Sequence, residues 1–307
     1  MNIAVTATGG GVGQSILKAL KGSGYNLIAL DSDHLAAGFC MVDKHRLIPY
    51  ASDDNYIPEL LKACKEEEIV LLFPGMDCEL QKLSENRNLF KDNNITVVVS
   101  DPGAVMIADN KYLTNKFLRN NNLPAMMTNR FSVVAKIWNM DYPIILKPEK
   151  GGARSKNVYK LNSQDDIPDN INLTDYVMQE YIEGDEYTCG TITLDKYYGC
   201  VILRRILRDG DTYKAFVEHN EYIESICRKV CEEIKPFGAF NIQLRLQDGV
   251  PYIFEFNARC SGTTACRALA GFNEPLMIAD YLLKGKEPKF DIKEMIILRY
   301  WNEIIKT

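Results

Sequence analysis

The first hundred residues alternate short apolar segments with helical patterns, and this alternation constrains the fold more than any other feature of the chain. The apolar segments span residues 3–6, 27–30, 69–73 and 95–99, and the helical patterns span residues 14–20 and 56–67. Strands that alternate with helices are typical of a parallel sheet with helices on both faces. We therefore predict an α/β fold that begins with a Rossmann-like, doubly wound domain over residues 1–105.

The rest of the chain has a different pattern, in which strands and hairpin turns dominate. Helical patterns at 105–122 are followed by strand patterns at residues 144–147, 157–161, 176–181, 187–194, 199–207, 239–246 and 252–257. Turn pairs such as Asp248-Gly249 are typical of antiparallel hairpins. One strong helical pattern at 221–235 interrupts the strands, with an apolar stripe of Tyr222, Ile226, Val230 and Ile234. An antiparallel α+β region is therefore expected after the first domain.

Composition and charge exclude several classes of function. The net charge of −5 provides no basic surface for nucleic acid. No run of 18 apolar residues occurs, and the N-terminal segment has the pattern of a strand rather than of a secretory signal. The nine cysteines are scattered, as is usual where thiols stay reduced. We expect a cytoplasmic protein that binds neither nucleic acid nor membrane.

A glycine-rich turn, TATGGGVGQ, joins the first predicted strand to the first helix. The dinucleotide-binding fingerprint needs a third small residue three positions after its second glycine. Counted from Gly9 or from Gly11, that position holds Gln14 or Ile16. Asp31 follows at a suitable distance for a ribose contact, so a nicotinamide-dependent oxidoreductase stays an alternative. The backbone amides of such a turn suit an anion, and a substrate-binding turn is the favoured interpretation.

The stretch FGAFNIQLRLQDGVPYIFEFNARCSGTT contains two strands whose polar side chains share a face. The period of two places Asn241 with Gln243, and Glu255 with Asn257. A hairpin with an odd-length loop over residues 247–251 would set Gln243 opposite Glu255 and Asn241 opposite Asn257. One carboxylate and three amides suit Mg²⁺, which is usually held by few carboxylates together with substrate phosphates. The alternative is a solvated polar face, yet its usual residues, Lys and Glu, are nearly absent.

Two further stretches suit a nucleotide. YPIILKPEKGGARSKNV ends a short strand at Lys147 and continues into a basic glycine loop. A lysine beside such a loop suits a polyphosphate, because the lysine supplies charge and the backbone can fold over the oxygens. A P-loop motif is absent, and a solvated hairpin is the alternative. VMQEYIEGDEYT runs from an apolar strand into an acidic turn that could bind ribose hydroxyls or an exocyclic amine.

Taken in order, these stretches resemble the ATP-grasp superfamily, through a strand lysine, a glycine loop, Q-E-Y-I-x-G-x-E and Q…E-x-N-x-R. The pattern is similar to that of a stand-alone relative of the carbamoyl-phosphate synthase large chain, over most of the sequence. The resemblance implies a pre-ATP-grasp domain over residues 1–105 and an ATP-grasp core of two subdomains with antiparallel sheets. The N-terminal subdomain, a lid, would span residues 106–183, and the C-terminal subdomain 184–307.

The resemblance also implies roles for single residues. Lys111 and Lys147 would contact the ATP phosphates, which a flexible loop at 151–156 would cover. The implied nucleotide site further comprises Gly151, Gly152, Ser155, Tyr181 and Gln243, with Glu180 and Ile182 at adenine and Glu186 at ribose. The implied metal ligands for Mg²⁺, or alternatively Mn²⁺, are Gln243, Glu255 and Asn257. Arg259 would contact the transferred phosphate and act in catalysis with Lys147, and the candidate substrate residues are Gly10, Gly11, Arg205 and Arg267.

The activity implied is that of an ATP-dependent carboxylate–amine ligase. ATP would phosphorylate a small carboxylate, and an amine or another nucleophile would attack the acyl phosphate, releasing ADP and phosphate. The sequence leaves open a carboxylate kinase that stops at the acyl phosphate, the oxidoreductase named above, and a non-catalytic nucleotide-binding protein. The expected partners are small molecules, and a homodimer is left open.

Overall fold

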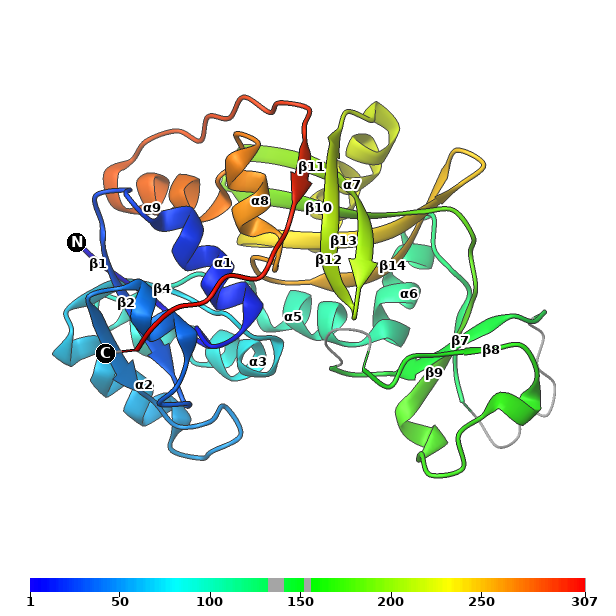
Figure 1. Ribbon diagram of the computed structural model, residues 1–307, viewed down its shortest axis with the longest axis horizontal. Coiled ribbons are helices and arrows are strands. Elements are labelled where there is room, and N and C mark those ends of the chain that lie inside the picture. The colour runs from blue at the N-terminus through cyan, green and yellow to red at the C-terminus, as the bar shows by residue number, and fades with distance from the viewer. Residues whose placement is uncertain (132–140, 152–155, 307) are drawn as a thin grey trace.

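The computed structural model describes residues 1–131, 141–151 and 156–306, and its N-terminal part is a parallel sheet (Figure 1). The strand order is β3-β2-β1-β4-β5, and all four pairings are parallel. The strands are β1 (Asn2–Val5), β2 (Asn26–Asp31), β3 (Lys44–Leu47), β4 (Ile69–Phe73) and β5 (Thr96–Val97). Its helices are α1 (Gly11–Leu20), α2 (Tyr56–Glu66), α3 (Asp77–Glu85) and α4 (Arg87–Lys91). The predicted Rossmann-like domain is confirmed.

A six-stranded antiparallel sheet forms the second layer, in the order β14-β13-β10-β11-β12-β15. Its strands are β10 (Asp185–Leu194), β11 (Tyr197–Arg208), β12 (Asp211–Glu218), β13 (Gly238–Gln247), β14 (Val250–Asn257) and β15 (Ile296–Leu298). The accompanying helices are α7 (Glu221–Ile234), α8 (Thr264–Leu269) and α9 (Glu274–Lys284). The antiparallel region predicted from the hairpin turns is therefore confirmed.

A smaller antiparallel sheet, in the order β6-β9-β7-β8, lies at the far end of the molecule from the parallel sheet (Figure 1). Its strands are β6 (Thr128–Arg130), β7 (Ile144–Pro148), β8 (Tyr159–Leu161) and β9 (Tyr176–Glu180). Short 3₁₀ helices occur at Ala37–Met41, Gln164–Asp166 and Leu173–Asp175. This sheet has its own small apolar core, formed by Ile144, Leu146, Leu161, Tyr176 and Met178.

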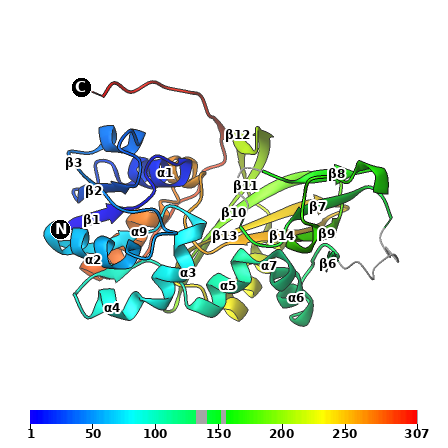
Figure 2. The ribbon, with the colours of Figure 1, turned by 90° about the horizontal axis from the view of Figure 1, so that it is seen from below.

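Helices α5 (Pro102–Asp109) and α6 (Lys111–Asn120) connect the parts and pack against strand β14 (Figure 2). Asn110 separates them, because its side chain accepts a hydrogen bond from the Leu113 amide at 3.0 Å and caps α6. Helix α1 of the first domain packs against α8 and α9. Apolar residues of the first domain and of the six-stranded sheet thus share continuous cores.

The helical stripe predicted for residues 221–235 needs one correction. Tyr222 is 49% exposed, whereas the buried face of α7 consists of Ile223, Ile226, Cys227, Val230, Cys231 and Ile234. The buried face therefore begins at Ile223, one residue after the predicted start, and small cysteine side chains form part of it. In the described ranges, no helix combines the length and apolar character needed to cross a membrane.

Candidate active site

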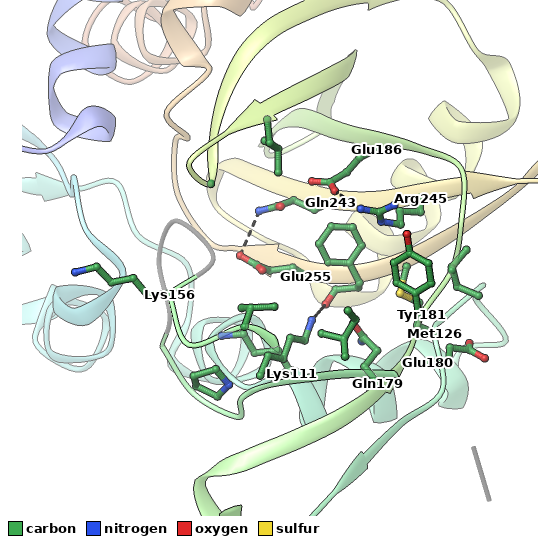
Figure 3. A pocket seen from close by; sticks show the side chains of 18 of the residues that line it. Lys111, Met126, Lys156, Gln179, Glu180, Tyr181, Glu186, Gln243, Arg245 and Glu255 are labelled. Atoms are coloured by element: carbon green, nitrogen blue, oxygen red, sulfur yellow. Dashed lines mark hydrogen bonds and ion pairs between the residues drawn. The ribbon is translucent and has the colours of Figure 1, made fainter. Parts of the chain in front are cut away.

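A cavity of about 290 Å³ lies between the four-stranded and the six-stranded sheet (Figure 3). Its walls come from β7 and β9 on one side and from β10, β11, β13 and β14 on the other. Residues of all three sequence stretches line it together with Lys111, namely Lys147, Gly151, Glu180, Tyr181, Ile182, Glu186, Gln243 and Glu255. Two of the candidate loop residues, Gly152 and Ser155, lie outside the described residues.

Two lysines enter this cavity from different elements. Lys147 ends the buried part of β7, and its Nζ donates to the carbonyl oxygen of Phe254 at 3.2 Å. Only 6% of its surface is exposed, and this burial lowers the pKa of its ammonium group to about 8, although the nearby Glu255 opposes the shift. Lys111 begins α6, and its Nζ donates to the carbonyl oxygen of Gly151. Both cations are available to a polyphosphate in this cavity.

The lining of the cavity also includes apolar side chains, namely Met126, Ile145, Val158, Ile182 and Leu207, and Tyr181. Glu180, expected to present backbone groups to adenine, has its amide engaged with the Met127 carbonyl at 2.9 Å. Its carboxylate accepts from the Met127 amide at 2.6 Å. The N–H of Glu180 is therefore taken up by the chain itself, which leaves Ile182 as the stronger candidate for a backbone contact.

Glu186, expected at ribose, is bound by two arginines. Arg205 Nη2 lies 2.6 Å from Oε1 of Glu186, and Arg245 Nη2 lies 2.8 Å from its Oε2. Arg245 was not among the predicted site residues, although it follows Gln243 by two positions and so shares its face of β13. The period of two therefore contained the signal for Arg245.

The polar hairpin, formed by β13 and β14, has the predicted cross-strand pairs, but its turn differs from the predicted one. Gln243 lies opposite Glu255 and Asn241 opposite Asn257, as predicted. The odd-length loop is wrong, because Asp248-Gly249 is a two-residue turn with positive φ at both residues. An extra residue in β14 restores the register: Gln243 pairs with Glu255 and Leu244 with Ile253, so Phe254 forms a β-bulge. The carbonyl that receives Lys147 is the one at this bulge.

Glu255 and Asn257 suit a hard cation better than Gln243 does. Oε1 of Glu255 and Oδ1 of Asn257 both face the amide group of Gln243, at 3.2 and 3.0 Å (Figure 3 shows the contact with Glu255). Gln243 points its own oxygen at the guanidinium of Arg205 instead. The carboxylate of Glu255, which lines the cavity, and the neighbouring amide oxygen of Asn257 fit Mg²⁺ that is otherwise held by phosphates. Within the described residues, no group of three or more His, Cys, Asp or Glu side chains could hold a metal.

A second cavity, of about 650 Å³, adjoins the first. The glycine turn Gly9–Val12, the segment Gly75–Asp77, and the side chain of Arg259 form its walls. Arg205, Gly210, Gln243 and Glu255 line both cavities. The candidate substrate residues Gly10, Gly11 and Arg205 therefore lie around one space that opens onto the metal-type ligands.

Arg267 does not belong to this group, and its predicted contact with substrate needs correction. Its side chain is completely buried, and it lines neither cavity. It forms an ion pair with Glu274, which is also completely buried, at 2.7 Å. Sequence reasoning identified a cation in the right segment, but Arg267 of helix α8 is buried against Thr188 and Asn241, on the same face of the sheet as the metal-type ligands but outside both cavities.

Part of the wall of the second cavity comes from segments in which the sequence shows no motif. Asp77 begins α3 and accepts a hydrogen bond from Arg259. Arg299 and Trp301 come from the segment after β15, which crosses toward the first domain (Figure 1). No sequence signal links residues 299–301 to the glycine turn, because only the pairing of β15 with β12 brings them there.

Comparison with known proteins agrees with this architecture. Residues 172–304 match the family model for an ATP-grasp in the biosynthetic pathway with Ter operon, and residues 3–98 match the PylC-like N-terminal domain. The ATP-grasp enzyme fsqD of Aspergillus fumigatus is 29% identical over 110 residues, which is 34% of this chain and 19% of that protein. D-alanine–D-alanine ligase A of Clostridium perfringens is 23% identical over 243 residues, 70% of this chain and 77% of that protein.

Solved structures share the fold across nearly the whole chain. N5-carboxyaminoimidazole synthetase from Staphylococcus aureus, in complex with ADP, superimposes with a TM-score of 0.77 at 14% identity, over 97% of this chain and 82% of its own. L-amino acid ligase from Bacillus licheniformis gives a TM-score of 0.73 at 16% identity, over 92% and 74%. The fold is that of an α/β protein with two adjoining cavities. Residues 172–304 match an ATP-grasp family, and the chain as a whole shares the fold of the two solved enzymes.

Proposed function

We propose that the protein is an ATP- and Mg²⁺-dependent ligase that joins a small carboxylate to an amine or another nucleophile through an acyl phosphate. The observation that carries the proposal is the junction of the two cavities at Gln243 and Glu255. The first cavity is lined by two lysines and several apolar side chains, which suit a nucleotide, and the second is lined by a glycine turn that suits an anion. A γ-phosphoryl group at the junction would lie next to a carboxylate in the second cavity.

The relatives support the same type of reaction. The names of two similar proteins are those of ligases, D-alanine–D-alanine ligase and L-amino acid ligase. The chain spans about a fifth of fsqD, so the activity of that longer protein is no guide to the whole reaction here. Which carboxylate and which nucleophile react is the open part of the proposal.

In the first step, a carboxylate oxygen of the substrate attacks the γ-phosphorus of ATP, and ADP leaves. Lys111 and Lys147 would neutralise the phosphate oxygens, and Arg259 would do so from the side of the second cavity. Glu255 and Asn257 would hold Mg²⁺, which supplies charge neutralisation when bound. These groups act by position and charge, so no side chain has to form a covalent bond.

In the second step, the nucleophile attacks the carbonyl carbon of the acyl phosphate, and phosphate leaves with the oxygen that it received. The substrate carboxylate would be held at the turn of Gly10 and Gly11, which lines the second cavity at the start of α1. Arg205 borders both cavities, so its positive charge would lie near the phosphoryl group both before and after the transfer. The walls of the two cavities would limit the access of water to the acyl phosphate.

The test is a screen for ADP release with ATP and Mg²⁺ over pairs of carboxylates and amines. Glu255→Ala should abolish Mg²⁺-dependent ADP release without loss of the folded state, because Glu255 supplies the single carboxylate of the cluster. Glu233→Ala, which removes an exposed carboxylate from α7, is the matched control and should keep wild-type turnover. Undiminished turnover in Glu255→Ala would overturn the metal assignment. Phosphorylation of a carboxylate without subsequent ligation would indicate a kinase instead.

A further inference from the structure

A buried ion pair lies next to Asn241, on the same face of the six-stranded sheet as the proposed metal ligands Glu255 and Asn257. Arg267 of α8 and Glu274 at the start of α9 have no exposed surface, and Nη1 of Arg267 lies 2.7 Å from Oε1 of Glu274. A buried pair of this kind adds little net stability compared with well-packed apolar side chains, because both charges lose their hydration. Stability alone therefore does not account for its presence in the core.

The ion pair fixes the orientation of one amide in the polar hairpin. Nη2 of Arg267 donates to Oδ1 of Asn241, and the hydroxyl of Thr188 donates to the same oxygen at 2.8 Å. An arginine has donors only, so the face of the Asn241 amide that meets it must be the oxygen. The Nδ2 of Asn241 is thereby directed outward, where it donates to Oδ1 of Asn257 at 2.9 Å.

The Oδ1 atom of Asn257 can accept two hydrogen bonds. One comes from Asn241, and the other comes from Nε2 of Gln243 at 3.0 Å. A metal ion bound to Asn257 would replace Gln243 there, since Gln243 borders both cavities and is partly exposed. Asn241 is 1% exposed and is held by Arg267 and Thr188, so it would keep its place.

The backbone next to the ion pair is adapted to it. Gly190, in the middle of β10, lies opposite Asn241 in the sheet. A Cβ atom at this position would lie 2.2 Å from Nη1 of Arg267 and 2.5 Å from Oε1 of Glu274. The φ angle of Gly190 is not positive, so the glycine is required here by the space that the ion pair occupies and not by backbone conformation.

We propose that Arg267 and Glu274 are positioning residues, which set the orientation of the metal ligand Asn257 through the amide of Asn241. The inference rests on the metal role given to Asn257 under the proposed function. It assigns Arg267 to neither substrate nor nucleotide, and it predicts that metal affinity depends on residues that the metal does not touch. Such outer partners of metal ligands typically contribute tenfold or more to affinity.

The test is the binding of Mn²⁺ in the presence of saturating ADP, measured from the electron paramagnetic resonance signal of free Mn²⁺. Arg267→Met/Glu274→Gln removes the pair without leaving a buried charge, and it should weaken Mn²⁺ binding by about 10- to 100-fold. Asn241→Leu should have a similar effect, and the combined variant should lose little more than either. Arg267→Lys, which keeps a cationic donor, should lose less than Arg267→Met.

Two further variants separate positioning from folding. Ile242→Val alters a completely buried residue on the other face of β13 and should leave Mn²⁺ affinity unchanged. Gly190→Ala pushes on the ion pair without removing a polar group, and it should weaken Mn²⁺ binding even if the pair-replaced variant fails to fold. Wild-type affinity in a folded pair-replaced variant, or additive losses in the combined variant, would overturn this relay, in which Arg267 and Glu274 act on Asn257 through Asn241. So would a wild-type protein that binds no Mn²⁺ with ADP.

The relay and the proposed function fail in different ways. A wild-type protein that binds Mn²⁺ with ADP in the manner predicted, yet releases no ADP with any carboxylate, would contradict the ligase proposal and support the relay. An active ligase whose Mn²⁺ affinity is unaffected by all of these variants would contradict the relay alone.

Discussion

Arg259 donates a hydrogen bond to the carboxylate of Asp77, a residue 182 positions earlier in the chain. The contact joins the segment after β14 to the start of α3, at the wall of the second cavity. Nη1 of Arg259 also donates to the carbonyl oxygen of Cys260 at 2.7 Å, so the guanidinium is held at two points. A cation that is fixed before the substrate binds needs no reorganisation when charge develops next to it.

Arg259→Gln should therefore lower kcat for ADP release by about 100- to 1,000-fold, the range found when one preorganised donor is removed from a transition state. ATP affinity should change little, because Arg259 lines the second cavity and not the first. Asp77→Asn keeps the cation but loosens its anchor, so its kcat should fall less. Steady-state kinetics and calorimetric ATP binding measure the two quantities, and a wild-type kcat in Arg259→Gln would contradict the assignment.

Lys147 should take up a proton when ATP binds near pH 8. Burial lowers the pKa of its ammonium group to about 8, against the charge of Glu255 and Glu186, while Lys111 adds to the shift. The triphosphate favours the charged lysine, so binding raises this pKa and draws a proton from solution at pH 8.5. At pH 6.5 the lysine is already charged, and uptake through it should vanish. Calorimetry in two buffers of different ionisation enthalpy measures the difference.

The same pKa shift has a defined sign for folding. Between pH 8 and the ordinary lysine pKa of about 10.4, the unfolded chain binds the proton that the ligand-free native protein lacks. Lys147 therefore increases the free energy of unfolding as the pH rises through this interval. The added stability is lost as the pH falls back to 8. Lys147→Met should abolish both the proton uptake and this dependence, whereas Lys229→Met, on the exposed face of α7, should alter neither.

The sequence was sufficient for the fold class and for the cross-strand pairs of the polar hairpin, because both follow from periodicity. It was insufficient for the way in which the hairpin closes. A two-residue turn with a bulge at Phe254 and an odd-length loop without one give the same pairing of Gln243 with Glu255. The Asp248-Gly249 pair favoured the two-residue turn, but the bulge at Phe254, whose carbonyl accepts from the distant Lys147, has no signal of its own in the local sequence.

The sequence also did not reveal where the arginine side chains lie in the structure. Arg259 and Arg267 are eight positions apart, yet Arg259 lines the second cavity whereas Arg267 is completely buried and lines neither cavity. Strand β3 was missed because all four of its residues are exposed and carry no apolar alternation. These features depend on how whole elements pack, which local patterns do not determine.

The turn of the polar hairpin offers a direct test of its geometry. Gly249 has a φ of +77°, and Asp248 has a φ of +51°. Gly249→Val should destabilise the protein by about 1–2 kcal/mol, because a β-branched residue is strained in the left-handed region. Asp248→Asn should be nearly neutral, since asparagine adopts that region readily. Urea denaturation measures both, and equal stability of Gly249→Val and wild type would indicate that the odd-length loop forms instead.

Arg299 offers a test of the second cavity as the carboxylate site. Its Nη1 donates to the carbonyl oxygen of Thr212 at 2.8 Å, and over the described part of the chain it forms no ion pair with a carboxylate. The other cavity arginines, Arg205 and Arg259, both have acidic partners. Among the described arginines that line the second cavity, Arg299 is thus the one without a carboxylate partner.

With the carboxylate that the ADP-release screen identifies, Arg299→Gln should raise KM for that carboxylate by about 10- to 100-fold, the loss expected for a hydrogen bond to a charged group. The dissociation constant for ATP should stay the same, because Arg299 does not line the first cavity. Arg299→Lys should recover part of the affinity. Arg208→Gln, which removes an exposed arginine at the end of β11 outside both cavities, is the matched control. An unchanged KM in Arg299→Gln, or an equal loss of ATP affinity, would place the carboxylate elsewhere.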